Sequence, residues 1–239
     1  MCLWREVLFG ATCHEAFCAK DVESAKSRLS LCAEDIRAQM DTTGNNSELC
    51  SQLGAVLGML GDCCRTMGDT GSAVAYFEES IEFLSKLPAD NQEVISPQPL
   101  LHIIPCDFGL PCLIILVTLP LHVTDTLSVS LNKVGDLKYY DGDLKAARSY
   151  YFRSLNMRRK AIKHHSHVSS QRLDVAVSLA KIADADRSLG NEDAALDRFQ
   201  EAIKLLESLT LKPEEAALEQ CRLSVLEFLK NQLSEKQSD

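Results

Sequence analysis

The stretch "LNKVGDLKYYDGDLKAARSYYFRSL" (residues 131–155) returns in altered form as "LAKIADADRSLGNEDAALDRFQEAI" (residues 179–203). In each copy a small residue and an Asp follow four residues after the first Leu, and a Gly follows seven residues after the small residue. A third copy starts at Leu57. The matching positions are Leu57, Leu131 and Leu179; Gly61, Gly135 and Ala183; Asp62, Asp136 and Asp184; Gly68, Gly142 and Gly190; Ala73, Ala147 and Ala195; and Phe77, Tyr151 and Phe199. The copies stand 74 and 48 residues apart, so 26 extra residues separate the first two, and such recurrence of one pattern indicates a repeat architecture.

Each recurring position has a mechanical role in a helical hairpin. The Gly suits the left-handed residue that ends a first helix. The Asp or Asn after that Gly can cap a second helix by accepting a backbone hydrogen bond. The Ala allows the two helices to approach closely, and the aromatic residue fills the space between them. The chain is therefore predicted to be all-α.

These offsets resemble the tetratricopeptide repeat, a helical hairpin of about 34 residues that stacks into a solenoid. The resemblance predicts tetratricopeptide-like hairpins at residues 53–67 with 70–87, 126–140 with 144–164, and 175–189 with 192–209. The wider spacing of the copies, as in kinesin light chain-like arrays, predicts longer helices than usual. A last amphipathic helix from residue 212 is expected to cap the array.

Six segments follow from this reading. They are N-terminal helices with a degenerate repeat at 1–48, a repeat at 49–95, an apolar Pro-rich insertion at 96–125, repeats at 126–170 and 171–211, and a capping helix with its tail at 212–239. The degenerate copy rests on Cys13, Asp21, Ala25, Leu29 and Cys32.

The insertion departs from the rest of the chain in composition. Residues 96–125 hold five of the seven prolines and no Lys, Arg or Glu. A bilayer span takes about 20 apolar residues, and Pro105, Asp107, Pro111 and Pro120 interrupt this tract. We therefore expect a poorly ordered segment outside the repeat core, whose deletion raises solubility and thermal stability. A translated intron and a genuine insertion are both open as its origin.

Charge and cysteine usage restrict the class of protein. The net charge of −9 argues against a nucleic-acid partner. The one basic cluster, residues 158–165, is expected to be the solvated end of a helix. No secretory signal opens the chain, so we expect a cytoplasmic protein with reduced thiols. Cys32, Cys63 and Cys221 are expected to pack as small hydrophobic residues.

Two groups of residues could bind zinc, which needs about four ligands. They are Cys13, His14 and Cys18, and His164, His165 and His167. Neither group has an obvious second pair of ligands, so we expect no metal and no cofactor. The sequence has no phosphate-binding loop, nucleophile elbow or H-E-x-x-H motif, and we expect no catalysis.

First-helix side chains that packing does not require are the predicted partner-binding residues, on the concave face of the array. They are Asn132, Lys133, Asp136, Lys181 and Asp184, whereas Arg198 is expected on the convex face. Some tetratricopeptide proteins clamp the C-terminal carboxylate of heat-shock chaperones with Lys and Asn at set places. Here Gly58, Asp62 and Lys133 depart from that pattern, so no such clamp is expected.

Segments such as "DVESAKSRLSLCAEDIR" and "ALEQCRLSVLEFLK" are similar to the C-terminal repeat region of the plant No Catalase Activity family. The similarity extends over nearly the whole chain outside residues 96–125. It implies a non-enzymatic, chaperone-like scaffold that keeps catalase folded and active, without that family's RING-type zinc domain. The alternative is a general tetratricopeptide adaptor, tethered to a membrane through the insertion.

Overall fold

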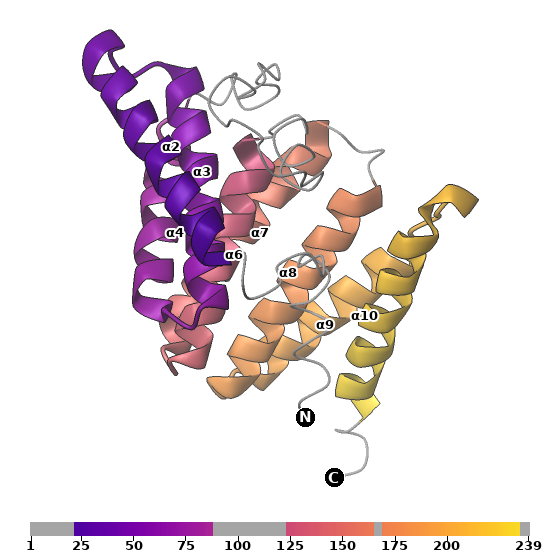
Figure 1. The fold of residues 1–239 in the computed structure, drawn as a ribbon. Helices are drawn as coiled ribbons and strands as arrows, with labels where there is room; N and C mark the ends of the chain where they lie inside the picture. Colours follow the sequence, from indigo (N-terminus) through magenta and orange to yellow (C-terminus); the bar gives the residue numbers. More distant parts are fainter. Residues whose placement is uncertain (1–21, 88–122, 165–168, 235–239) are drawn as a thin grey trace. The chain divides into compact units, whose positions relative to one another are not determined.

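The computed structural model describes residues 22–87, 123–164 and 169–234. Every regular element in these ranges is helical, which confirms the all-α prediction (Figure 1). The chain divides into two compact units between Lys133 and Val134, within one helix, α6 (Val123–Tyr140).

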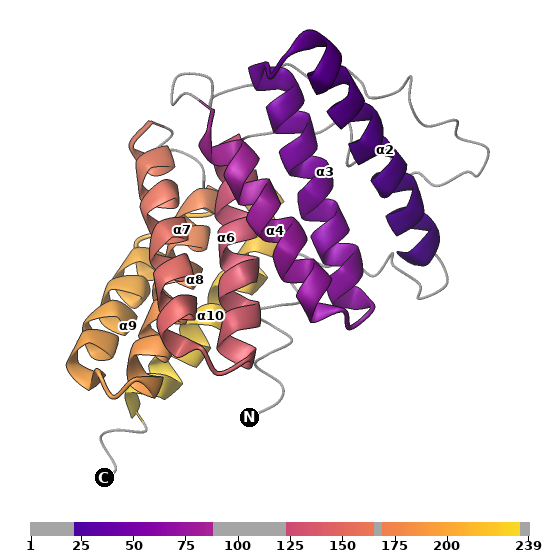
Figure 2. The ribbon, with the colours of Figure 1, turned by 90° about the vertical axis from the view of Figure 1, so that its left-hand side faces the viewer.

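The first unit contains α2 (Val22–Thr43), α3 (Ser47–Thr66), α4 (Thr70–Ser85) and the first part of α6. The helix α3 packs against both α2 and α4, and α3 with α4 forms an antiparallel hairpin (Figure 2). Its core consists of apolar side chains from all of these helices. The largest that are fully buried are Ile36, Leu53, Leu57, Leu60, Phe77, Leu84 and Leu131; Leu131 lies on α6.

The second unit contains the rest of α6, α7 (Leu144–His164), α8 (Ser169–Ser188), α9 (Glu192–Glu207), a 3₁₀ turn η3 (Pro213–Glu215) and α10 (Ala216–Ser234). The helix α8 packs against α7 and α9, and α10 covers α8 and α9. Tyr151, Leu179 and Phe199 lie in one continuous apolar core with Leu229 of α10. The predicted C-terminal helix therefore covers the last hairpin.

The turns inside the hairpins follow the predicted pattern with one exception. Gly68, Gly142 and Gly190 have positive φ angles of 80°, 83° and 80°, in the left-handed region that favours glycine. Asp69 accepts a capping hydrogen bond from the Ser72 amide at 3.0 Å, and Asp143 accepts one from Ala146 at 3.1 Å.

The third cap prediction is wrong. The side chain of Asn191 makes no capping bond to α9. Its side-chain nitrogen instead donates to a carboxylate oxygen of the buried Asp186 on α8, at 3.5 Å.

The first helices of the hairpins begin three to six residues before the predicted starts, at Ser47, Val123 and Ser169. Residues 123–125 of the expected insertion therefore belong to α6, and Val123 is fully buried. The remainder of the insertion, and the residues proposed for zinc apart from His164 at the end of α7, lie outside the described residues.

The basic cluster at the end of α7 is not simply solvated, which corrects the sequence-based expectation. Arg158 is only 9% exposed and donates to the Asp174 carbonyl at 2.7 Å and to the Ser178 hydroxyl at 2.9 Å. Arg159 pairs with Glu201 of α9. These two arginines link α7 to α8 and α9.

The cysteines behave as small apolar side chains, as expected. Cys32 and Cys63 are buried, Cys221 is half-buried, and all three are free thiols. Burial is the main cause that raises the pKa of each of these thiols. A raised pKa disfavours the reactive thiolate.

Candidate functional site

Lys133, one of the predicted partner-binding residues, forms an internal ion pair in the first unit. It leaves α6 toward α3, where its ammonium contacts the carboxylate of Asp62. The same ammonium lies 5.5 Å from the centre of the Phe77 ring, a cation–π distance. The Lys133 side chain is 22% exposed. This lysine therefore joins α6 to the preceding hairpin.

Lys181 and Asp136 form the corresponding pair in the second unit. The Lys181 ammonium donates to both carboxylate oxygens of Asp136, at 2.8 and 2.9 Å. It lies 5.7 Å from the centre of the Tyr151 ring, and the Tyr151 hydroxyl donates to Asp136 at 2.8 Å. The side chains of Lys181 and Asp136 are only 10% and 11% exposed. This pair is more deeply buried than the one in the first unit.

The two ion pairs occupy equivalent positions in the repeat. In each, the Lys stands two residues after a motif Leu, and its Asp stands five residues after the motif Leu of the preceding copy. The ring beneath each Lys is the motif aromatic residue of that preceding copy. Each pair therefore fixes a first helix against the hairpin before it.

The other two predicted residues differ in exposure. Asn132 of α6 is only 6% exposed and is therefore buried. Asp184 of α8 is partly exposed and has no hydrogen-bond or ion-pair partner in the described ranges. Of the five residues, the structure brings Asp136 and Lys181 into contact and leaves the carboxylate of Asp184 open.

A fully buried polar contact of the second unit was not predicted. Asp186 of α8 is fully buried and pairs with Arg148 of α7, at 2.5 Å, and with Arg198 of α9. Both guanidinium groups lie over the Phe152 ring, at 4.7 and 5.0 Å from its centre. Arg198, which was expected on the convex face, is thus part of an interhelical network.

The spacing of residues along α8 contains a sequence signal for this network. Leu179, Ala183 and Asp186 are spaced by four and three residues, so Asp186 falls on the helix face that carries the motif Leu. An acid on an apolar face requires a cationic partner. Which arginines supply it depends on the packing of α7 and α9 against α8.

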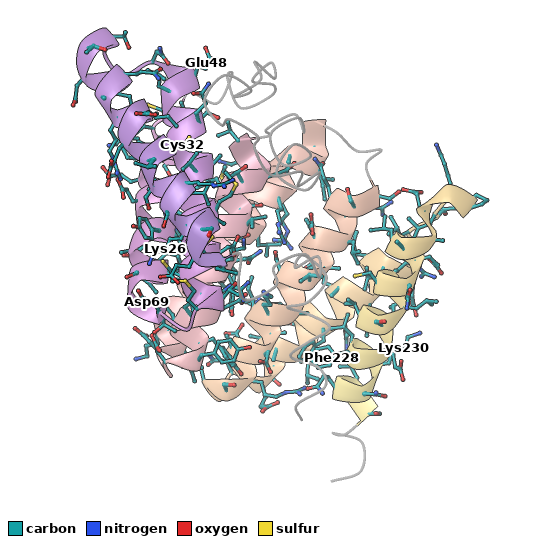
Figure 3. All side chains as sticks on the ribbon, viewed as in Figure 1. Lys26, Cys32, Glu48, Asp69, Phe228 and Lys230 are labelled. Carbon is teal, nitrogen blue, oxygen red and sulfur yellow. The ribbon has the colours of Figure 1, made fainter. Side chains whose placement is uncertain are left out.

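A smaller polar cluster joins α2 to the α3–α4 hairpin. Lys26 of α2 lies near Asp69, at the start of α4 (Figure 3). A hydrogen bond with the Cys64 thiol is the main cause that raises the pKa of Lys26. The hydroxyl of Ser72, followed by its backbone amide, holds the pKa of Asp69 below its usual range. Of these contacts, the one between Lys26 and Cys64 links α2 to α3, whereas Asp69 and Ser72 both lie at the start of α4.

The described residues include one small cavity. One cavity of about 160 Å³ opens beside the N-terminus of α3, lined by Asn45, Asn46, Ser47, Cys50, Phe83, Lys86 and Leu87. Small-molecule sites usually enclose about 300–1,000 Å³. Within the described ranges, no three His, Cys, Asp or Glu side chains are grouped as metal ligands. None of the described helices is long and apolar enough to cross a membrane.

Comparison with known proteins agrees with the repeat pattern. The tetratricopeptide repeat family matches residues 55–83, which include the turn between α3 and α4. Protein NCA1 of Arabidopsis thaliana is 59% identical over 218 residues, which are 91% of this chain and 47% of that protein. The chain thus spans about half the length of this curated relative.

Two solved structures are more distant. BtubC (BKLC) from P. vanneervenii has a TM-score of 0.45 at 14% identity, over 88% of this chain and 74% of that one. MamA has a TM-score of 0.38 at 12% identity, over 92% of this chain and 96% of that one. The hairpins, their turn glycines and the match at residues 55–83 show a tetratricopeptide-like helical repeat, and the chain is similar to Protein NCA1 over 91% of its length.

Proposed function

We propose that this chain is a non-enzymatic scaffold that binds another protein through the first helices of its hairpins, and that the partner is catalase. The observation that carries the scaffold proposal is the repeated hairpin. Its apolar motif residues and aromatic rings are used in packing, whereas Asp184 on a first helix keeps an open carboxylate. First helices line the extended binding surface of helical solenoids.

The choice of catalase rests on the similarity to the No Catalase Activity family. The similarity to Protein NCA1 extends over 91% of the chain. We propose that the scaffold acts as a chaperone by holding a partly folded catalase subunit and limiting its aggregation. Such a function needs binding energy and no catalytic group.

Refolding of catalase provides the direct test. Catalase unfolded in guanidinium chloride is diluted into buffer with this chain, with serum albumin at equal mass, or alone, and the recovered peroxide-decomposing activity is measured. We expect higher recovery only with this chain, together with co-elution of the two proteins on gel filtration. Equal recovery in the three samples and separate elution would refute catalase as the partner.

The internal ion pairs determine which variants suit this test. Charge reversal at Lys133 or Lys181 would break a pair with Asp62 or Asp136 and would disturb folding as well as binding. Variants of exposed side chains avoid this effect. A change at Asp197, an exposed acid on the second helix α9, serves as a control in which catalase recovery is expected to equal that of the wild type.

A further inference from the structure

The two Lys–Asp pairs define a rule for the first helices. The Asp that follows the small motif residue receives a Lys from the next first helix, as Asp62 receives Lys133 and Asp136 receives Lys181. Asp184 is the third acid in this position. It is partly exposed, and the described residues supply it with no partner.

The helix that follows Asp184 in the array is α10, and it has two cations. Arg222 donates two hydrogen bonds to Glu219 of its own helix in a bidentate ion pair, at 2.6 and 2.7 Å. Lys230, labelled in Figure 3, pairs with Glu207 of α9 at 2.8 Å. Both cations of α10 are therefore engaged elsewhere. Among the described residues, the acid acceptor of the third repeat has no partner, while those of the first two are filled from within the chain.

We propose that Asp184 is a specificity residue that accepts a lysine or arginine side chain of the bound protein, in the role that Lys133 and Lys181 play inside the array. This inference rests on the proposed scaffold function and adds the chemistry of the contact. The occupant is a protonated amine or guanidinium because that is what the two equivalent acids bind. Complementary charge at such a contact favours basic partners over acidic ones.

The contact can be tested with a library of random twelve-residue peptides displayed on phage and selected on the immobilised full chain. The wild type is expected to enrich peptides with Lys or Arg at one fixed position. Asp184→Asn, which keeps the size of the side chain, is expected to lose this enrichment. Asp184→Lys is expected to enrich Asp or Glu there, and Asp197→Asn to behave as the wild type.

A peptide selected on the wild type is then used to measure how much the contact with Asp184 contributes to affinity. Its affinity is expected to fall about threefold to tenfold on Asp184→Asn, in the range of a partly exposed ion pair. Replacing the basic residue of the peptide by norleucine is expected to cause the same loss, with no further loss on the variant. Circular dichroism melts of each variant show whether it is folded as the wild type is.

The results separate this inference from the proposed function. Recovery of no peptides, or of the same peptides on wild type and Asp184→Asn, would overturn the role of Asp184. Catalase binding that is unchanged in Asp184→Asn would also overturn it while leaving the scaffold proposal intact. Selection of basic peptides without any binding of catalase would refute catalase and retain the role of Asp184.

Discussion

The ring of Tyr151 lies directly against the backbone of Gly135. A Cβ atom placed on Gly135 would stand 2.5 Å from the Cε1 atom of the ring, which is closer than two non-bonded carbon atoms approach one another. Gly61 and Phe77 have the same relationship at 2.6 Å. The small motif residue is therefore required by the aromatic motif residue of the second helix, which is buried in both hairpins.

Gly135→Ala is expected to lower the free energy of unfolding by about 1–2 kcal/mol. Overpacking a core costs roughly 1–3 kcal/mol, and the gain in helix propensity from Gly to Ala returns up to about 1 kcal/mol. Gly58→Ala is the matched control because its Cβ would meet only the Ser130 and Ser80 hydroxyls, at 3.6 and 3.8 Å. Urea denaturation measures both, and equal stabilities would contradict the packing argument.

The Lys181–Asp136 pair is expected to contribute more to stability than the Lys133–Asp62 pair. Lys181→Met leaves the Asp136 carboxylate, which is 11% exposed, without its lysine. By contrast, Lys133→Met leaves the Asp62 carboxylate, which is 33% exposed, with Arg65 still 3.6 Å away. Loss of one partner from a buried pair costs about 3–5 kcal/mol, and from an exposed pair at most about 1 kcal/mol. In thermal or urea unfolding we expect a loss of stability toward the first range for Lys181→Met and toward the second for Lys133→Met. A larger loss of stability in Lys133→Met than in Lys181→Met would show that burial does not determine the cost of breaking each pair.

Asp186 is expected to be the most sensitive acid of the second unit. Asp186→Ala removes the acceptor of Arg148 and Arg198 from the interface of three helices. Hydrogen bonds to charged groups are worth about 1.5–3 kcal/mol each, so a loss of at least ~2 kcal/mol is expected. Asp197→Ala, on the exposed face of α9, is expected to change stability by less than about 0.5 kcal/mol. Similar melting temperatures for the two variants would refute the network.

Alkaline pH is expected to destabilise the second unit through Tyr151. Burial, followed by the neighbouring Asp136 charge and hydrogen bond, raises the pKa of this phenol in the folded state. The folded state therefore holds the proton more tightly, and this contribution is complete below an unfolded pKa of about 10 and decreases above it. Each pH unit above 10 is expected to cost about 1.4 kcal/mol while the folded phenol stays protonated.

Tyr151→Phe isolates this effect because its ring does not titrate. Urea unfolding between pH 9 and pH 11 is expected to show a smaller decline in stability for the variant than for the wild type. Parallel declines would mean that other groups, such as the lysines, cause the whole alkaline effect.

Local features of the fold were predictable from the residues alone. Gly68, Gly142 and Gly190 end first helices at the expected places because only a residue without Cβ adopts a positive φ without strain. Asp69 and Asp143 cap the following helices as predicted. These properties depend on neighbours within a few positions, and the period of the repeat displays them in the sequence.

The partners of the charged side chains were decided by the tertiary structure. Lys133 and Lys181 reach acids 71 and 45 positions earlier in the chain, and Arg148 and Arg198 converge on Asp186 from two different helices. The hydrophobic period places a charge on a helix face but does not specify the axial register of the next helix. Only packing of the helices sets that register. Among the described residues it gives partners to Asp62 and Asp136 and none to Asp184.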